Sequence, residues 1–220
     1  IHAGPEIGVA STKAFTCQLA VLLLMALKAA QDRSEISEID IAKTVDDLKS
    51  LPSTLSQYLG STNSIQDIAY KLSTASDVLF LGRGLMYPVA LEGALKLKEI
   101  SYIHSEGYAA GELKHGPIAL IDDSVPVIIL APCDELFEKN ISNMHEVIAR
   151  KANVTLISDK EGLQSAGSIV KNTIEMPRTN KLLTPLVYAL PIQLLAYFSA
   201  VSKGTDVDQP RNLAKSVTVE

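Results

Sequence analysis

Cysteine is scarce in this sequence, and the scarcity limits the kinds of protein it can encode. The 220 residues contain only Cys17 and Cys133, and neither belongs to a CxxC pair or to a Cys/His spacing that binds zinc. Cys17 lies in an apolar, helix-like run and Cys133 follows an apolar, strand-like run. We therefore expect two buried thiols in a reducing, cytoplasmic environment, and neither a disulfide scaffold nor a metal site.

Blocks of basic residues and long apolar runs are missing as well. The formal net charge is −5, from 20 Lys and Arg against 25 Asp and Glu, and no basic cluster offers a footprint for nucleic acid. The longest apolar stretch, around residues 19–27, is shorter than the roughly 20 residues that a membrane span needs. These absences argue against a nucleic-acid partner and against a membrane segment.

The chain also lacks a basic leader, because it opens directly with Ile1. This start predicts the interior of a longer polypeptide whose N-terminal part is missing. With 47% apolar and 20% charged residues, the composition is that of a globular protein. The length allows one large α/β domain with a helical leader.

Apolar, β-branched runs predict strands at residues 78–81, 125–130, 154–157 and 174–176. Apolar residues at helical spacing predict helices at about 12–31, 64–75, 87–102, 136–150 and 183–202, with two more between 32 and 66 separated by Pro52. The alternation indicates βαβ units and hence an α/β fold. We expect a doubly wound, mainly parallel sheet in a flavodoxin-like or Rossmann-like three-layer arrangement, preceded by a helical segment.

The turn Gly82-Arg83-Gly84 lies between a predicted strand and a predicted helix, where ligands of doubly wound domains bind. Its glycines would let backbone N–H groups approach a phosphate at the helix N-terminus. The alternative is a tight turn that needs glycine only for its dihedral angles. No Ser or Thr stands within the turn to bind phosphate oxygens.

On the following helix, Glu92, Lys96 and Glu99 are spaced i, i+4 and i+7 and therefore share one face. They could form a solvated ladder of ion pairs, each worth about 0.2–0.5 kcal/mol. They could equally bring two carboxylates and an amine to an acid–base site. Spacing alone leaves both interpretations open.

Two further residues have a structural and a chemical interpretation. His115 precedes Gly116-Pro117, which is typical of a helix end, yet an imidazole could also move protons near neutral pH. Lys215 lies in a segment, residues 206–215, that reads as a frayed chain end. A lysine beside small and apolar neighbours is also how an imine-forming amine would be presented to a site.

Three long segments resemble the glucosamine-6-phosphate synthase family, also called glutamine:fructose-6-phosphate amidotransferase. They are Glu6–Phe15, the stretch from Ala90 through His104 to Pro117, and the tail Asp206–Glu220. The resemblance implies the sugar isomerase (SIS) fold. It also implies three parts: residues 1–60 as the end of a first SIS subdomain with a helical linker, residues 61–203 as the second SIS subdomain, and residues 204–220 as a catalytic tail.

The resemblance further implies that the chain converts fructose 6-phosphate and glutamine-derived ammonia into glucosamine 6-phosphate, without a metal or organic cofactor. Glu99 resembles the base that moves a proton between sugar C1 and C2, and Lys96 its assisting amine. His115 resembles the group that opens the sugar ring, contributed across a homodimer to the neighbouring site. Lys215 resembles the amine that forms a Schiff base at C2. The residues that resemble sugar-lining positions are Val9, Ser11, Ala214 and Glu92.

The chemistry of these residues agrees with the roles. Proton transfer from C1 needs a carboxylate, and an imine at C2 makes the C1 hydrogen more acidic than a ketone does. The family's Ser/Thr-rich phosphate loop belongs to the first SIS subdomain, which this chain lacks apart from its end, and the glutaminase domain is absent. We therefore expect the chain alone to be inactive and to bind fructose 6-phosphate weakly.

Two alternatives belong to other functional classes. The first is a non-catalytic SIS module that senses sugar phosphates, and the second is a flavodoxin-like module that binds a protein partner. A regulator would normally carry a basic helix-turn-helix, and a partner-binding module would not need the Lys215 tail.

Overall fold

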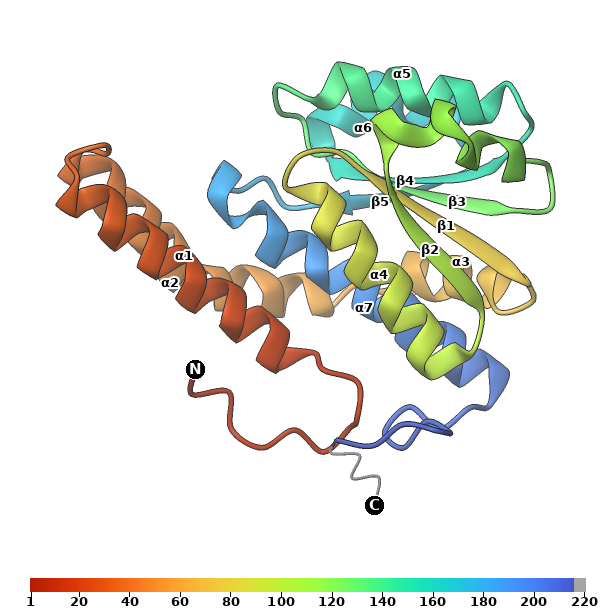
Figure 1. Ribbon diagram of the computed structural model, residues 1–220, viewed down its shortest axis with the longest axis horizontal. Coiled ribbons are helices and arrows are strands. Elements are labelled where there is room, and N and C mark those ends of the chain that lie inside the picture. Colours follow the sequence, from red (N-terminus) through yellow and green to blue (C-terminus); the bar gives the residue numbers. More distant parts are fainter. Residues whose placement is uncertain (216–220) are drawn as a thin grey trace.

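Five parallel strands form the centre of the molecule in the computed structural model, which describes residues 1–215 (Figure 1). The strand order is β2-β1-β3-β4-β5, the flavodoxin-like order in which β1 and β3 flank the point where the winding reverses. The predicted doubly wound, parallel α/β fold is therefore confirmed. The strands are β1 Asp77–Gly82, β2 His104–Ala109, β3 Pro126–Leu130, β4 Asn153–Asp159 and β5 Asn172–Met176.

Helices cover both faces of this sheet and complete the three layers (Figure 1). One face carries α3 Asn63–Leu72, α4 Met86–Ser101 and α7 Thr184–Lys203. The other face carries α5 Phe137–Ile148 and α6 Lys160–Ala166. The helices α1 Lys13–Asp32 and α2 Glu38–Leu59 precede the sheet.

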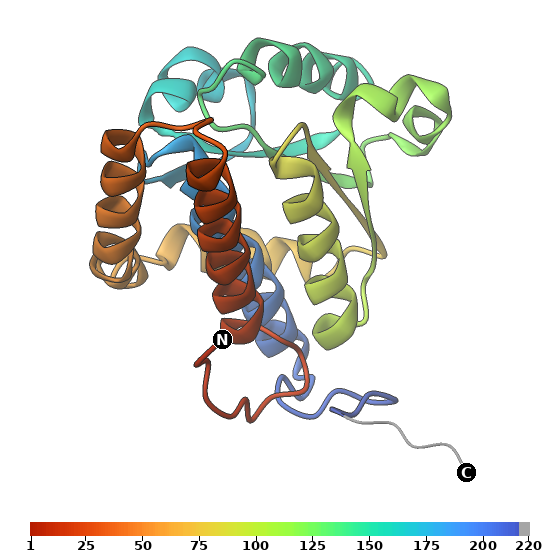
Figure 2. The ribbon, with the colours of Figure 1, turned by 60° about the vertical axis from the view of Figure 1, so that its left-hand side comes forward.

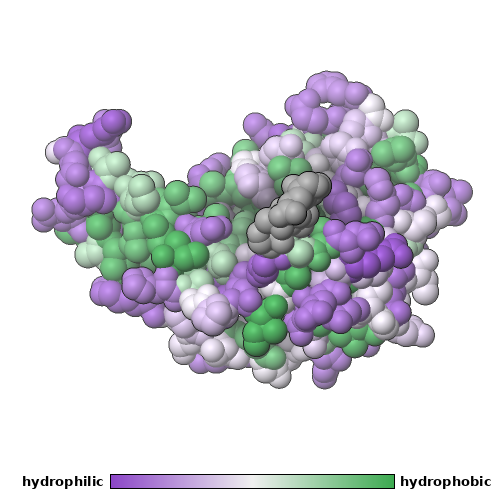
Figure 3. Space-filling model, turned by 60° about the horizontal axis from the view of Figure 1, so that its bottom comes forward, coloured by the Kyte–Doolittle hydropathy of each residue, from purple (hydrophilic) through white to green (hydrophobic). Residues whose placement is uncertain are grey.

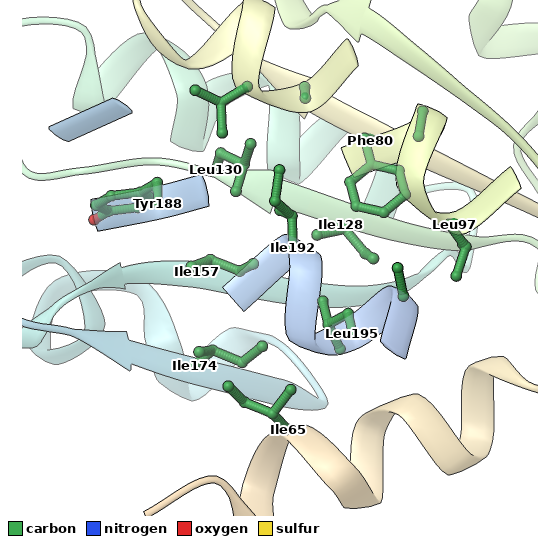
Figure 4. Packing of buried hydrophobic residues seen from close by; sticks show 14 of the residues in the cluster. Ile65, Phe80, Leu97, Ile128, Leu130, Ile157, Ile174, Tyr188, Ile192 and Leu195 are labelled. Atoms are coloured by element: carbon green, nitrogen blue, oxygen red, sulfur yellow. The ribbon is translucent and has the colours of Figure 1, made fainter. Parts of the chain in front are cut away.

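The larger part of the core lies between the sheet and the α4–α7 layer (Figure 4). Phe80 of β1 and Ile128 of β3 pack there against Leu97 of α4, and Ile192 of α7 fills the space between them. All four side chains are fully buried. Because burial of such a side chain contributes about 1.5–3 kcal/mol, this layer fixes α4 firmly on the sheet.

Strand β2, residues His104–Ala109, was not predicted, because its sequence HSEGYA contains no apolar run. It pairs with β1 at the edge of the sheet, with Leu81 opposite Tyr108. The buried hydroxyl of Ser105 donates a 2.7 Å hydrogen bond to the Ala94 carbonyl of α4. A Cβ atom on Gly107 would lie 2.8 Å from the backbone of Leu91, so only glycine allows α4 to approach here.

The predicted break at Pro52 is wrong, because α2 runs without interruption from Glu38 to Leu59. Leu51 is buried, and Leu48 and Leu55 pack on the same core cluster, so the apolar face is continuous across the proline. Tertiary packing thus outweighs the helix-breaking tendency of proline at this site. Helices α1 and α2 form a hairpin that projects from the body of the molecule (Figures 1 and 2).

The stretch near residues 19–27 was expected to be too short to span a membrane, and the length of the helix that contains it contradicts this expectation. Two helical segments are long and apolar enough to cross a membrane, judged by length and composition alone. They are α1 and the segment Lys181–Lys203, which contains α7. Most of the second segment is buried inside the domain, whereas very little of α1 is. Burial in the core accounts for the apolarity of α7, and α1 instead presents apolar side chains on the surface of the projecting hairpin (Figure 3).

Candidate active site

Helix α4 holds three charged side chains that are largely withdrawn from solvent. The Lys96 Nζ lies 2.5 Å from Glu99 Oε2 and 3.5 Å from Glu92 Oε1. The Lys96 side chain is only 4% exposed, against 12% for Glu92 and 22% for Glu99. A solvated ladder of ion pairs is therefore excluded, and the arrangement matches a buried carboxylate–amine–carboxylate cluster.

The electrostatics of this cluster follow from its burial. Burial raises the pKa of Glu92, and the nearby Glu99 carboxylate acts in the same direction, whereas the positive charge of Lys96 opposes both. One amine thus compensates two carboxylates in a site with little water. Such groups are retained only when each is paired, since an isolated buried charge is strongly unfavourable.

The segment after α7 folds back over the molecule instead of fraying. Gly204, with a φ of 70°, ends the helix in the left-handed conformation that glycine adopts without strain. The Thr205 hydroxyl then donates a 2.6 Å hydrogen bond to the Ile100 carbonyl of α4. The Asp208 carbonyl accepts a 2.8 Å bond from the Val9 N–H, which joins this segment to the N-terminal one. The two segments meet near the end of the described tail in Figure 1.

Tyr102 anchors the next part of the tail. It ends α4 in a left-handed conformation, with a φ of 60°, and its hydroxyl accepts a 2.8 Å hydrogen bond from the Arg211 N–H. The Arg211 guanidinium lies 4.3 Å from the centroid of the Tyr102 ring, a cation–π geometry. These contacts bring residues 211–215 back to the end of α4 that carries Glu99.

Lys215 is the last described residue, and its amine is held by the N-terminal segment. The Nζ atom donates to Glu6 Oε2 and to the Val9 carbonyl, each at 3.0 Å. The interpretation of residues 206–215 as a frayed end is therefore wrong, and residues 216–220 of the predicted tail lie outside the described residues. Val9 contacts Lys215 through its backbone carbonyl, whereas Ala214 is exposed and lines neither the cavity of Glu6 nor that of Glu99.

A cavity of about 360 Å³ lies between Lys96 of the α4 cluster and Glu6 of the N-terminal segment, whereas Glu99 lines a neighbouring cavity with Tyr102 and Arg211. Lys96 and Glu6 line the first cavity from opposite elements, and Ala10 and Thr12, the neighbours of Ser11, extend its wall. The lining segments are therefore α4, α7, the N-terminal segment and the tail. Their meeting could not be read from residue spacing, because they are separated by up to about 200 positions in the chain.

Gln193 of α7 is a cavity residue that sequence reasoning missed. It lines the same cavity, and its Nε2 atom is buried without a hydrogen-bond partner among the described residues. Buried amide donors are nearly always paired, so an unpaired one beside a cavity is unusual. The only sequence signal is a polar residue in an apolar helix.

His115 does not reach this cavity from within its own chain. It ends the short helix Ala110–His115, which follows the carboxyl end of β2, whereas Glu99 lies near the end of α4 that precedes β2. Its side chain is 72% exposed, with Nδ1 2.7 Å from Glu112 Oε2. Gly116, with a φ of 139°, and Pro117 end the helix as their sequence predicts.

The contacts of the Gly82-Arg83-Gly84 turn favour a tight turn that needs glycine for its geometry over a phosphate-binding turn. A Cβ atom on Gly82 would lie 2.3 Å from the Met86 carbonyl, and Gly84 has a φ of 53°. The Arg83 guanidinium is occupied by Asn143 Oδ1, at 3.0 Å from Nε and 2.9 Å from Nη2. The glycines thus allow the tight entry into α4, and the arginine is engaged elsewhere.

Among residues 1–215, no group of three or more His, Cys, Asp and Glu side chains has a metal-binding arrangement. Cys17 and Cys133 are free thiols, and both are half-buried where full burial was expected. Burial raises the pKa of Cys133, with a further contribution from the nearby carboxylates of Glu161 and Asp159.

Comparison with known proteins agrees with this geometry. A family model described as SIS domain matches residues 71–203, more than half of the chain. Glutamine–fructose-6-phosphate aminotransferases (isomerizing) of Zymomonas mobilis and Bartonella quintana are each 59% identical over 219 residues. These cover all of this chain, which spans about a third (36%) of the length of either relative.

A solved structure extends the likeness to three dimensions. It is the C-terminal domain of glucosamine-fructose-6-phosphate aminotransferase from Francisella tularensis, 44% identical, with a TM-score of 0.91 over 95% of this chain and 59% of that one. A glucosamine-6-phosphate deaminase from Thermotoga maritima, 24% identical with a TM-score of 0.64, shares the fold. The chain therefore belongs to the SIS domain family, and its close relatives there are glutamine–fructose-6-phosphate aminotransferases.

Proposed function

We propose that this chain forms part of an isomerase site that converts fructose 6-phosphate and ammonia into glucosamine 6-phosphate and water. The observation that carries the proposal is the cavity between the buried Glu92–Lys96–Glu99 cluster and the segment that holds Lys215. Ammonia would come from glutamine in a part of the protein outside this chain. The names of the relatives support this reaction.

In the proposed mechanism, Lys215 attacks the C2 carbonyl of the open-chain sugar and forms an imine with loss of water. Ammonia then displaces the lysine nitrogen from C2, which leaves the ammonia-derived imine at C2 and frees Lys215. Glu99 takes a proton from C1 and returns it to C2, while the imine nitrogen gains a proton and the C1 hydroxyl loses one to give the aldehyde. Lys96 holds the carboxylate and the sugar hydroxyls in place. The imine accelerates the proton transfer because it draws electrons from C1 more strongly than a ketone does. The proposed sugar-lining residues are Val9, Ser11, Ala214 and Glu92.

Ring opening is assigned to His115 of a second copy of the chain. The exposed position of His115, away from the cavity of its own chain, supports a role across a dimer. The hydrogen bond from its ring to Glu112 would orient the imidazole for proton exchange. The proposal thus requires a homodimer in which each site uses residues of both copies.

The division of the chain is proposed with this function. Residues 1–60 would complete a first SIS subdomain, residues 61–203 form the second, and residues 204–220 act as the catalytic tail. The α1–α2 hairpin supports this division, because it projects from the sheet and exposes apolar side chains (Figure 1). We further propose a cytoplasmic protein without a membrane or nucleic-acid partner, consistent with two free thiols and a net charge of −5.

The test is reduction with borohydride in the presence of fructose 6-phosphate, which traps an imine as a stable amine. It uses this chain joined to the N-terminal part found in its longer relatives. Peptide mapping should find the sugar on Lys215, and Lys215→Arg should abolish trapping, because a guanidinium is too weak a nucleophile. A sugar found on Lys96, or full synthesis by Lys215→Arg, would contradict the proposal. A non-catalytic sensor would bind the sugar and give no trapped product.

The shared site can be tested by mixing two inactive proteins. Subunits carrying His115→Ala and subunits carrying Lys215→Arg should regain activity when they exchange, since a mixed dimer contains one site with both native residues. Random exchange predicts about a quarter of the wild-type activity. Activity that stays absent after proven exchange would show that His115 does not act across the dimer.

A further inference from the structure

Glu6 has no role in the mechanism above, yet its carboxylate is held firmly beside the cavity. Its side chain is only 10% exposed. One oxygen, Oε1, accepts hydrogen bonds from the N–H groups of Thr12 and Ala14, each at 3.0 Å. Thr12, which its sequence favours as the cap of α1, makes no side-chain cap bond. Glu6 therefore caps α1 from outside the helix, and this fixes the direction of its second oxygen.

That second oxygen meets the amine proposed to form the imine. Glu6 Oε2 lies 3.0 Å from Lys215 Nζ, and the Val9 carbonyl accepts from the same nitrogen at 3.0 Å. Burial raises the pKa of Glu6, but hydrogen bonds from Ala14, Lys215 and Thr12 outweigh it, and the pKa falls to about 2. Glu6 is thus an anion throughout the neutral range.

We propose that Glu6 is a positioning residue for Lys215, which holds the amine at the cavity and acts as counter-anion to the imine. This inference rests on the proposed function, because it assumes that Lys215 forms the imine. Glu6 lines the cavity, and although Lys215 is not itself a lining residue, its amine lies within hydrogen-bond distance of this carboxylate. The Val9 carbonyl takes a second proton of the ammonium group, and the third has no hydrogen-bond partner among residues 1–215.

The charge balance of the step explains why an anion is useful there. Overall, the ammonium group of Lys215 and the C2 carbonyl give a protonated imine and water: one proton passes from nitrogen to the carbonyl oxygen so that the neutral amine can attack, and a second follows before water leaves. The N–C2 bond forms, the C2–O bond breaks, and two protons leave the nitrogen with the oxygen. Nitrogen therefore carries one positive charge at the start and at the end of the step, and a fixed carboxylate stabilises it at both without having to move.

The two oxygens of Glu6 allow its two roles to be separated. Glu6→Gln keeps an oxygen that can accept from Thr12 and Ala14, so the helix cap is retained while the charge beside Lys215 is lost. Glu6→Ala removes both. If Glu6 were only a cap, the glutamine variant would behave as wild type in every measurement.

The first measurement uses the 220-residue chain without any sugar. Acetic anhydride labels free amines, and mass spectrometry reports the rate at each lysine. Glu6→Gln should raise the labelling rate of Lys215 several-fold, because the amine loses its carboxylate partner. Glu135→Gln is the matched control: it removes the partner of Lys181, an exposed pair elsewhere on the surface, and should leave Lys215 unchanged. Equal labelling of Lys215 in wild type and Glu6→Gln would overturn the inference.

The second measurement is the rate of imine trapping in the chain joined to the N-terminal part of its relatives. Glu6→Gln should slow trapping at Lys215 by about tenfold or more, because the amine is no longer held in one position for attack on C2 and this loss outweighs its greater freedom to react; fructose 6-phosphate affinity and melting temperature should stay near those of wild type. A wild-type protein that traps no sugar would refute the proposed function while leaving the labelling result intact. Wild-type trapping that Glu6→Gln matches in rate would refute the positioning role alone.

Discussion

Helices α4 and α1 place their side chains in opposite ways. On α4, the charged side chain of Lys96 is only 4% exposed. On α1, the apolar residues Leu22 and Met25 are 60% and 62% exposed. Each helix thus departs from the usual rule that charge faces water and apolar surface faces the core.

The two departures have different causes. The buried charges of α4 are paired with one another, and Lys96 and Glu99 each line a cavity, so their unfavourable burial is tied to the proposed chemistry. The apolar face of α1 has no chemistry of its own, and a contiguous exposed apolar surface marks a contact surface. The buried, paired charges of α4 are thus what the proposed site requires, and the exposed apolar side chains of α1 are what the proposed first SIS subdomain would cover.

The largest effect is expected at Glu99. Glu99→Gln should lower glucosamine 6-phosphate synthesis by about 10²–10⁴-fold, because an amide cannot accept the C1 proton although it fits the same space. Imine trapping at Lys215 should remain. Both are measured in the chain joined to the N-terminal part of its relatives, with Glu138→Gln on the exposed face of α5 as the matched control. Synthesis near the wild-type rate in Glu99→Gln would remove Glu99 from the proposed mechanism.

Lys96 should have the largest effect on stability. Lys96→Met leaves two partly buried carboxylates without a cation and should lower the free energy of unfolding by about 3–5 kcal/mol at pH 7. Burial already raises the pKa of Glu92, and loss of Lys96 raises it further. A carboxyl whose pKa is raised by folding contributes stability at low pH and loses it as pH rises through the folded value.

The deficit of Lys96→Met should therefore shrink as the pH falls toward the ordinary value for Glu of 4.5. Urea unfolding at several pH values measures it. Lys98→Met, on the exposed face of the same helix, is the matched control and should change stability by less than about 0.5 kcal/mol. A deficit that is independent of pH would mean that lost packing, not unpaired charge, destabilises the variant.

Most of the fold could be predicted from the sequence, because four strands are apolar runs and four of the helices between and before them have clear periodicity. Strand β2 could not, since its place at the sheet edge depends on a hydrogen bond from Ser105 to α4 and on the close approach at Gly107. The short helix α6 was also not predicted from the sequence. The continuity of α2 through Pro52 depends on the core that its leucines contact.

The site was predicted as a set of residues by family resemblance, not as a geometry. Spacing placed Glu92, Lys96 and Glu99 on one face, but the burial that excludes a solvated ladder comes from α7 and the segments folded over it. Glu6 lies within a segment that resembles the family, but no role was predicted for it. Its two partners, α1 and Lys215, contact it only in the folded chain. Long-range contacts of this kind leave no periodic signal.

The third prediction concerns the anchor that brings the tail to α4. Tyr102→Phe removes the acceptor for the Arg211 N–H but keeps the ring beneath the guanidinium. The loss of one hydrogen bond should weaken the docking of residues 204–215 by about 0.5–1.5 kcal/mol. Amide hydrogen exchange should show faster exchange there and an unchanged rate in β1 and β3. Unchanged exchange throughout would show that Tyr102 does not hold the tail.

The smallest effect is expected on the exposed face of α1. In the 220-residue chain, the double variant Leu22→Ser, Met25→Ser should change the free energy of unfolding by less than about 0.5 kcal/mol, because both side chains already face solvent. Leu27→Ala is the matched control on the same helix, since Leu27 is 5% exposed and its truncation should cost about 2–5 kcal/mol.

The same double variant separates an interface from a merely apolar surface when it is placed in the longer protein. If residues 1–60 complete a first SIS subdomain, Leu22 and Met25 become buried there, and burial of each is worth about 1.5–3 kcal/mol. The variant should then be clearly destabilised in the longer protein and near neutral in the chain. A loss above about 1 kcal/mol in the chain itself would show that this face already packs within it. Neutrality in both proteins would leave α1 without a covering subdomain, and the proposed boundary at residue 60 would have to be abandoned.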